Sequence, residues 1–352
     1  MPSRGLLLLA LMATLSACSK LPFSQPATPE IASQPEPLAE PAILSAEPPK
    51  VTIVPVPEVV IEVVNTADSN TPELAETVPE PSVDISFFGL PTPEVDFSII
   101  DLCQEIGDKL SSVSVQDCLD QQLQSTGGFS VLKRPLAVRE YPELPQRESL
   151  GRVLLIGGIH GDEYSSVSIA FKWMEILNEY HSGVFHWQFI PLSNPDGLLG
   201  EESRRQNENG VDLNRNFPSA DWNDSAASFW EDKTDSNERR YPGESGGSEP
   251  EVAWLVKHIN EFQPDVIISV HAPYHLVDYD GPPAAPEQLG DLHLNRLGVY
   301  PGSLGHYAGV DLDKPVVTIE LPYAGIMPSE NQISKMWTDL VAWLVEERTK
   351  ER

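Results

Sequence analysis

Residues 153–163 have the sequence Val-Leu-Leu-Ile-Gly-Gly-Ile-His-Gly-Asp-Glu. The continuous apolar run at its start predicts a strand that is buried on both faces, as in a parallel sheet. Two glycines close the run, and then come His160 and Glu163 with two residues between them. Open α/β sheets place their sites at the carboxyl ends of strands. A His and a Glu are two of the three protein ligands that a catalytic zinc needs. Taken alone, the pair fits an ordinary turn better than a metal site, so the assignment of a metal site depends on residues elsewhere in the chain.

Apolar runs and helical periodicity alternate through the second half of the chain. We predict strands at 132–141, 153–158, 185–192, 266–270 and 316–321, and helices at 165–180, 250–262 and 329–347. Strands that alternate with helices indicate an α/β fold, here a mixed, mostly parallel sheet flanked by helices. Residues 219–240 are predicted to be a polar loop. Its Trp222 and Trp230 either stack on a substrate or, as we prefer, pin the loop to the domain.

The N-terminus has the features of an export signal. Residues 1–17 begin with a positive charge at Arg4 and continue with an apolar run that is too short to span a bilayer. Leu-Ser-Ala-Cys at 15–18 resembles the lipobox of bacterial lipoproteins, which implies cleavage before Cys18 and acylation of that cysteine. Ser19 follows in place of an Asp, and the resemblance to lipoproteins implies that this favours sorting to the outer membrane. We therefore expect the protein on the periplasmic side of that membrane, anchored by lipid at Cys18.

Residues 18–96 contain proline every few positions, scattered Glu and few basic residues. This composition predicts a disordered tether, partly of polyproline character. The tether is either a plain solvated spacer or a segment that threads the cell wall.

Cys103 and Cys118 are the only thiols left once Cys18 is acylated. Because exported compartments are oxidising, the two most simply form one disulfide. Their spacing matches no common zinc knuckle, so metal binding is the poorer interpretation. We expect a short, disulfide-stapled helical segment at 97–127, followed by a single catalytic domain at 128–352.

The formal net charge is −30 and the pI is near 4.4. Such a surface repels nucleic acid and offers no polybasic patch for anionic lipid. We therefore expect no nucleic-acid partner, and membrane attachment through the lipid anchor only.

Three features further along the chain support a metal site at His160 and Glu163. His271 follows the apolar strand at 266–270, so parallel neighbours would bring a His, Glu, His set onto one metal; alone, it would be a structural histidine. Glu320 interrupts a buried strand pattern, which is costly unless the charge is paired or used. It suits a general base, or else it faces solvent at the strand end. Residues 204–218 combine three arginines with several amides, which suits either a substrate carboxylate or a solvated loop.

Six motifs stand in one order along the chain: His-Gly-Asp-Glu at 160–163, Asn-Pro-Asp-Gly at 194–197, Gly-Val-Asp-Leu-Asn-Arg-Asn-Phe at 210–217, Tyr-Pro-Gly at 241–243 with Ser-Glu-Pro-Glu at 248–251, Ser-Val-His at 269–271 and Thr-Ile-Glu-Leu at 318–321. Together they resemble the zinc carboxypeptidases of the carboxypeptidase A type, from about Ser130 to the C-terminus. Within that family the chain is most similar to murein peptide amidases, whose pattern matches Tyr-Pro-Gly-Ser-Leu-Gly at 300–305 and Glu-Leu-Pro at 320–322.

The resemblance implies one zinc ion and a role for each matching residue. His160, Glu163 and His271 match the zinc ligands, and Asp212 matches the carboxylate that orients the first histidine. Glu320 matches the general base and acid. Asn214 and Arg215 match the pair that holds the substrate's terminal carboxylate. Arg205, or the adjacent Arg204, matches the arginine that stabilises the oxyanion. Tyr300 corresponds to the tyrosine over the terminal carboxylate, although its loop spacing departs from the pancreatic pattern.

These implications define the expected function. The chain would be a monomeric zinc metallocarboxypeptidase, or murein peptide amidase, acting on muropeptides with a free carboxylate at the bond between D-Glu and diaminopimelate. A zinc deacylase of the aspartoacylase or succinylglutamate desuccinylase type and a non-catalytic wall-binding lipoprotein are the alternatives. Four acids, which we expect to be solvated loop residues, are candidates to meet a basic amine of the substrate: Asp278, Asp280, Asp311 and Asp313.

Overall fold

The computed structural model of the protein describes residues 97–282 and 284–350. The predicted signal peptide, the acylation site Cys18 and the predicted tether up to residue 96 lie outside these residues and remain predictions. Within the described ranges, no helix is both long enough and apolar enough to cross a membrane.

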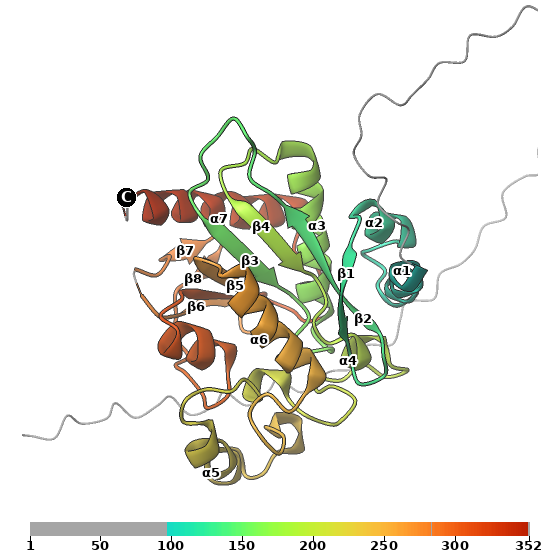
Figure 1. The fold of residues 1–352 in the computed structure, drawn as a ribbon, viewed down its shortest axis with the longest axis vertical. Coiled ribbons are helices and arrows are strands. Elements are labelled where there is room, and N and C mark those ends of the chain that lie inside the picture. The colour runs from blue at the N-terminus through green and yellow to red at the C-terminus, as the bar shows by residue number, and fades with distance from the viewer. Residues whose placement is uncertain (1–96, 283, 351–352) are drawn as a thin grey trace, which may run out of the picture. The chain divides into compact units, whose positions relative to one another are not determined.

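A seven-stranded sheet forms the centre of the fold, in the order β1-β2-β4-β3-β5-β9-β6 (Figure 1). Its strands are β1 (Gln124–Phe129), β2 (Pro135–Tyr141), β3 (Arg152–Ile156), β4 (His186–Ile190), β5 (Val266–His271), β6 (Leu276–Asp280) and β9 (Val316–Glu320). The four inner strands β4, β3, β5 and β9 are parallel, whereas β1, β2 and β6 pair antiparallel towards the edges. The predicted mixed, mostly parallel sheet is therefore confirmed. β7 (Gln288–Leu289) and β8 (Leu292–His293) form a separate small ribbon.

Helices cover both faces of this sheet. α3 (Tyr164–Tyr180) and α7 (Glu330–Lys350) lie on one face, and α6 (Pro250–Phe262) lies on the other (Figure 1). Successive residues of β3 point alternately into these two layers. Leu155 belongs to the core that contains the α3 and α7 residues, and Leu154 belongs to the core that contains those of α6. Both side chains are fully buried, which explains why the strand is an unbroken apolar run in the sequence.

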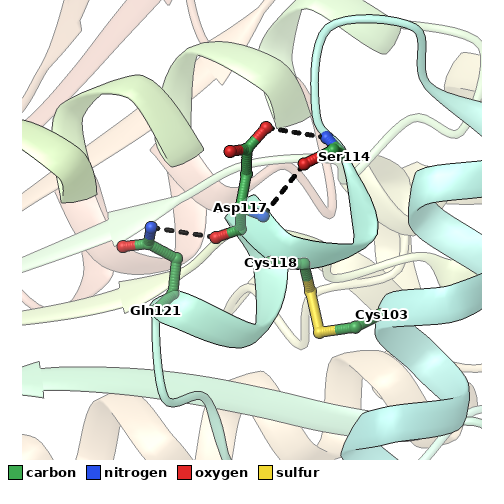
Figure 2. Close-up of a disulfide and its surroundings, with 5 residues drawn as sticks. All are labelled: Cys103, Ser114, Asp117, Cys118 and Gln121. Atoms are coloured by element: carbon green, nitrogen blue, oxygen red, sulfur yellow. Dashed lines mark hydrogen bonds between the residues drawn. A yellow bond between two sulfur atoms is a disulfide. The ribbon is translucent and has the colours of Figure 1, made fainter. Parts of the chain in front are cut away.

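The described chain begins with a short helical pair, α1 (Phe97–Lys109) and α2 (Val115–Asp120). Cys103 and Cys118 join the two helices by a disulfide (Figure 2). Ser114 caps α2: its hydroxyl accepts a hydrogen bond from Asp117 N at 3.1 Å, and the Asp117 carboxylate accepts one from Ser114 N at 2.8 Å. Both cysteines are fully buried in the core that α3 shares, so the pair is packed onto the sheet domain.

The sequence prediction is wrong or incomplete in three places. Residues 219–240 are not a loop, because they contain α5 (Trp222–Thr234) and the 3-10 helix η2 (Glu238–Arg240). α5 is rich in Ser, Asp and Ala and lacks the apolar stripe that signals a helix. The strands β1 and β6 are also missing from the prediction, since β1 contains two glycines and β6 two acids, residues that are depleted in strands.

Three further short elements are α4 (Pro195–Leu199), the 3-10 helix η1 (Leu213–Arg215) and the π-helix η3 (Gly305–Asp311). Asn194 caps α4, because its side-chain oxygen accepts a hydrogen bond from Gly197 N at 2.9 Å. Ser329 precedes α7 and accepts a bond from Gln332 N at 3.4 Å, as an N-cap does.

Candidate metal centre and active site

The carboxyl ends of β3, β5 and β9 lie side by side, because these strands are parallel neighbours. His160 and Glu163 are on the loop after β3, β5 ends at His271, and β9 ends at Glu320. No more than 6% of any of these four residues is exposed. The structure thus brings together the four residues that the sequence analysis connected.

His160, Glu163 and His271 direct one possible ligand atom each towards a common point, and these atoms lie within 4.8 Å of one another. Nδ1 of His160 is 2.7 Å from Oε1 of Glu163. Nδ1 of His271 is 3.1 Å from His160 Nδ1 and 3.1 Å from Glu163 Oε2. Ligand atoms about 2.0 Å from a tetrahedral zinc are roughly 3.3 Å apart, so this spacing fits one zinc ion. Two imidazole nitrogens and a carboxylate that face one another hold more lone pairs than protons, and a cation satisfies that arrangement.

The surroundings of the cluster favour the metal-binding forms of Glu163 and His271. Burial raises the pKa of the Glu163 carboxyl, but His160 and His271 outweigh it and hold this pKa below its usual range. Burial lowers the pKa of His271, which keeps its imidazole neutral. At His160 burial also disfavours the charged ring, yet the nearby carboxylates of Glu163 and Asp212 raise its pKa. An ionised carboxylate and a neutral imidazole are ligand forms for zinc.

A polar neighbour holds the far nitrogen of each histidine. Nε2 of His160 lies 3.2 Å from Asp212 Oδ1, and Nε2 of His271 lies 2.9 Å from Ser269 Oγ. Contacts of this kind fix the ring orientation and leave each Nδ1 for a metal. The sequence predicted this role for Asp212 but not for Ser269. The available signal was the spacing, because two residues along a strand lie on the same face.

Arg205, and not Arg204, lies at the cluster. Its Nε donates to Asp212 Oδ2 at 2.8 Å, and its Nη1 is 3.6 Å from Glu163 Oε1. Burial disfavours the Arg205 charge, but Asp212 and Glu163 outweigh this effect and raise the pKa of Arg205. Arg204 instead pairs with Glu208 near the surface. Arg205 therefore offers a permanent positive charge next to the candidate metal ligands.

Glu320 lies beside the ligands. It is the residue of β9 paired with His271 of β5, and within the described part of the chain its carboxylate accepts a single long hydrogen bond, from Tyr274 N at 3.5 Å. Burial, and then repulsion by Glu163, raise the pKa of Glu320 well above its usual range. A buried carboxyl group with a raised pKa suits a group that takes up a proton and returns it.

Asn214, Arg215 and Tyr300 form a second group next to the cluster. Arg215 is 8% exposed, and its Nε has no hydrogen-bond partner in the described part of the chain. The ring of Tyr300 lies on its guanidinium, with 4.6 Å from Cζ to the ring centroid. Asn214 Oδ1 accepts a bond from Leu304 N at 2.8 Å, which fixes that side chain. A buried guanidinium N–H without a partner is completed by a ligand oxygen such as a carboxylate.

Trp222 holds the α5 segment to the rest of the domain, as expected, whereas the contacts of Trp230 lie within the segment and at the adjoining Tyr241. Trp222 is buried and its Nε1 donates to Arg215 O at 2.9 Å. Trp230 Nε1 donates to Asn237 O at 2.8 Å, and its ring contacts Tyr241.

The expectation of solvated loop acids is wrong for Asp278 and Asp280, which lie on the edge strand β6. Asp278 pairs with Thr318, so it shares a face of the sheet with Glu320, two residues further along β9. Asp278 is 6% exposed and accepts a hydrogen bond from Leu297 N at 2.9 Å. The place of these two acids in the sheet was not predicted because the strand β6 was not predicted.

Known proteins resemble this chain in the same region. The family model for zinc carboxypeptidases matches residues 122–295. Murein peptide amidase A of Escherichia coli K12 is 32% identical over 206 residues, which are 55% of this chain and 79% of that protein. The crystal structure of a murein-tripeptide amidase from Escherichia coli O157 is 28% identical and covers 63% of this chain and 90% of that one, with a TM-score of 0.46. Bovine thrombin-activatable fibrinolysis inhibitor, in its complex with a tick carboxypeptidase inhibitor, is 18% identical and covers 73% of this chain and 96% of that chain. Its TM-score of 0.50 shows a likeness of fold.

Proposed function

The chain belongs to the zinc carboxypeptidase family, and on this premise we propose that it hydrolyses peptidoglycan-derived peptides at the bond between D-Glu and diaminopimelate. One observation carries the proposal: His160, Glu163, His271 and Glu320 converge in a chain that is 32% identical to a murein peptide amidase.

His160 and His271, through Nδ1, and Glu163, through its carboxylate, would hold the zinc ion. When bound, zinc polarises the scissile carbonyl and lowers the pKa of a bound water to about 7. Three protein ligands are the number that catalytic zinc sites use.

The side chains of this protein supply the remaining chemistry. Glu320 takes the proton of the attacking water and returns it to the leaving amine, a role for which its burial and its place beside His271 suit it. Arg205 stabilises the negative charge that develops on the carbonyl oxygen, where loss of one such donor costs about 3 kcal/mol. Arg215 and Asn214 bind the free carboxylate of the leaving residue, with Tyr300 over the guanidinium.

A digestion experiment tests the proposed substrate directly. Purified protein with zinc is incubated with the tripeptide L-Ala-γ-D-Glu-meso-diaminopimelate, and the products are read by mass spectrometry. Free diaminopimelate is the expected product, and Glu320→Gln protein is the matched blank. No release of diaminopimelate, together with turnover of N-acyl amino acids, would reject the peptidase proposal in favour of a deacylase.

We further propose that the domain works at the periplasmic side of the outer membrane, attached through Cys18 by a tether that ends near residue 96. The lipobox-like residues at 15–18 and the proline-rich composition that follows support this location. Labelled palmitate supplied to cells that make the full chain should enter the wild-type protein and not the Cys18→Ser variant, and only the wild type should sediment with membranes.

A further inference from the structure

An ion pair that the catalytic assignment does not use lies directly beside the metal cluster. Arg239 Nη1 donates to Asp162 Oδ2 at 2.7 Å, and Asp162 is the residue that precedes Glu163. The other carboxylate oxygen, Asp162 Oδ1, is buried and has no hydrogen-bond partner among the described residues. About 44% of the Arg239 side chain is exposed, so Asp162 fixes this guanidinium while leaving part of it open to a ligand.

Arg240, the next residue, is half-buried, and its guanidinium forms no hydrogen bond or ion pair within residues 97–282 and 284–350. In a protein with 53 acidic residues and only 23 Lys and Arg, an arginine inside the domain without an acid beside it is unusual. Arg240 also lies close enough to Arg215 to disfavour the charge of that residue, although burial of Arg215 contributes more. Because Arg240 is the chain neighbour of Arg239 and also lies near Arg215, an anion bound beside Arg239 and Arg240 would relieve this repulsion.

The backbone of η2 is attached firmly to the active-site segment. Tyr241 O, just after η2, accepts a hydrogen bond from Asp212 N at 2.8 Å, and Glu238 O accepts one from Gln206 Nε2 at 2.9 Å. The Asn237 side chain caps η2 by accepting a bond from Arg239 N at 3.0 Å. A site of this kind is pre-organised, so little conformational entropy is lost when a ligand binds.

The position of Arg239 distinguishes the two sides of the scissile bond. Asp162 lies near enough to Arg205 to favour its charge, and Arg205 is the group assigned to the carbonyl oxygen. Arg215, with Tyr300 over it, is the group assigned to the leaving residue's carboxylate. Arg239 therefore belongs to the Arg205 half of the site, where the acyl residue of a substrate would lie.

The charges around the cluster leave room for a second anion. Four arginines lie at or near the cluster, Arg205, Arg215, Arg239 and Arg240, together with the carboxyl groups of Asp162, Glu163, Asp212 and Glu320. With the two positive charges of a zinc ion added, positive charges outnumber the carboxylates, so the site can accept a substrate with more than one carboxylate. One of these belongs to the leaving residue at Arg215.

We propose that Arg239 and Arg240 form a carboxylate-binding subsite on the acyl side, so that the enzyme selects peptides whose acyl residue carries a free carboxylate beside the scissile bond. This inference rests on the proposed function. A γ-linked glutamyl residue has such a group, because its α-carboxylate is free. The corresponding isoglutaminyl residue has a neutral amide in its place.

Two synthetic tripeptides that differ in this one group test the proposal: L-Ala-γ-D-Glu-diaminopimelate and L-Ala-γ-D-isoglutaminyl-diaminopimelate. We expect the zinc-loaded wild type to prefer the free carboxylate by about 10- to 100-fold in kcat/KM, as for a lost charge-assisted hydrogen bond. The ratio should fall towards one in the Arg239→Gln/Arg240→Gln double variant and partly in each single variant. Arg147→Gln, a change of an exposed arginine, is the matched control and should keep the wild-type ratio.

Binding supplies the second readout. Calorimetric Kd values for both tripeptides are measured on Glu320→Gln protein with and without the two arginine changes, and thermal melts check that each variant folds. Equal rates on the two peptides by the wild type, or a preference that survives the double change, would overturn the subsite. If neither peptide is hydrolysed, the proposed function fails. Calorimetry then decides the subsite alone: a carboxylate preference lost with the arginines supports it, and equal binding rejects it.

Discussion

His271 and Glu320 lie directly opposite each other in the parallel pairing of β5 with β9, so their side chains share one face and one end of the sheet. The backbone strengthens this relationship, because Leu321 N donates to His271 O at 2.8 Å. A candidate metal ligand and a candidate proton carrier are therefore held at a fixed separation by sheet hydrogen bonds. Sites built on strands in this way are more precise than sites built on free loops.

This pairing predicts that the proton-carrying role and the metal-binding role of the site can be separated. In Glu320→Gln the amide fills the same space and cannot take up a proton, so kcat should fall by about 10²- to 10⁴-fold. Zinc content, measured by mass spectrometry of the protein, should stay that of the wild type. Glu202→Gln, at an exposed position, is the control for handling. A Glu320→Gln enzyme with wild-type turnover would exclude this carboxyl group as the base.

Metal removal should affect both activity and stability. A chelator should abolish hydrolysis, and added zinc should restore it. Zinc at 100 times its Kd should stabilise the fold by about 2.7 kcal/mol, measured as a higher unfolding midpoint. His271→Ala should lose this stabilisation, whereas His293→Ala, at an exposed position on β8, should retain it. The ligand assignment fails if His271→Ala still gains stability from zinc as the wild type does.

The contact between Asp212 and His160 predicts that loss of the Asp212 carboxylate lowers zinc affinity, but less than loss of a metal ligand does. Asp212 orients the His160 ring through Nε2 and also holds Arg205, so Asp212→Asn should weaken both contacts. We expect zinc affinity to fall by about 10- to 100-fold, measured by competition with a chelating dye. An unchanged affinity would mean that packing alone orients the histidine.

The sequence predicted the inner part of the fold because its signals are local. β3, β5 and β9 are buried on both faces, and such strands are continuous apolar runs. β6 is an edge strand with acids at alternate positions, so its pairing with β9 depends on contacts far away in the sequence. The same reason hides Arg239, because nothing local connects it to Asp162. Ser269 is different: its spacing from His271 is local, but its role appears only once the orientation of the His271 ring is known.

The disulfide between Cys103 and Cys118 gives a stability prediction outside the active site. It joins cysteines 15 residues apart and lies in the core shared with α3. A loop of that length is worth about 3 kcal/mol in the chain-entropy model. The Cys103→Ala/Cys118→Ala variant should therefore unfold at lower denaturant concentration, and reducing agent should shift the wild type towards it. Reduction should leave the midpoint of the variant unchanged, which is the internal control.

Asp280 predicts a pH dependence of stability that does not involve the metal site. Burial and the neighbouring Asp278 raise the pKa of Asp280 to about 7, and Arg296 opposes this shift. η3 packs closely onto Asp280: Gly305 lies against the carboxylate and Gly309 against the Cβ and backbone, and a Cβ at either glycine would clash with Asp280. The folded protein therefore holds this proton more tightly than the unfolded chain, whose carboxyl has the ordinary pKa of 3.8.

The sign follows from proton linkage. Because the native state binds more protons between pH 3.8 and about 7, the contribution of Asp280 is fully favourable below pH 3.8 and is lost as pH rises to about 7. The loss is at most about 4 kcal/mol. Asp280→Asn keeps the shape and removes the titration. Its free energy of unfolding, measured by urea titration, should exceed that of the wild type at pH 8, and the difference should shrink towards pH 5. Asp232→Asn, on the exposed side of α5, should show no such convergence. A difference between Asp280→Asn and the wild type that is the same at pH 5 and pH 8 would mean that the Asp280 carboxyl titrates normally in the folded protein.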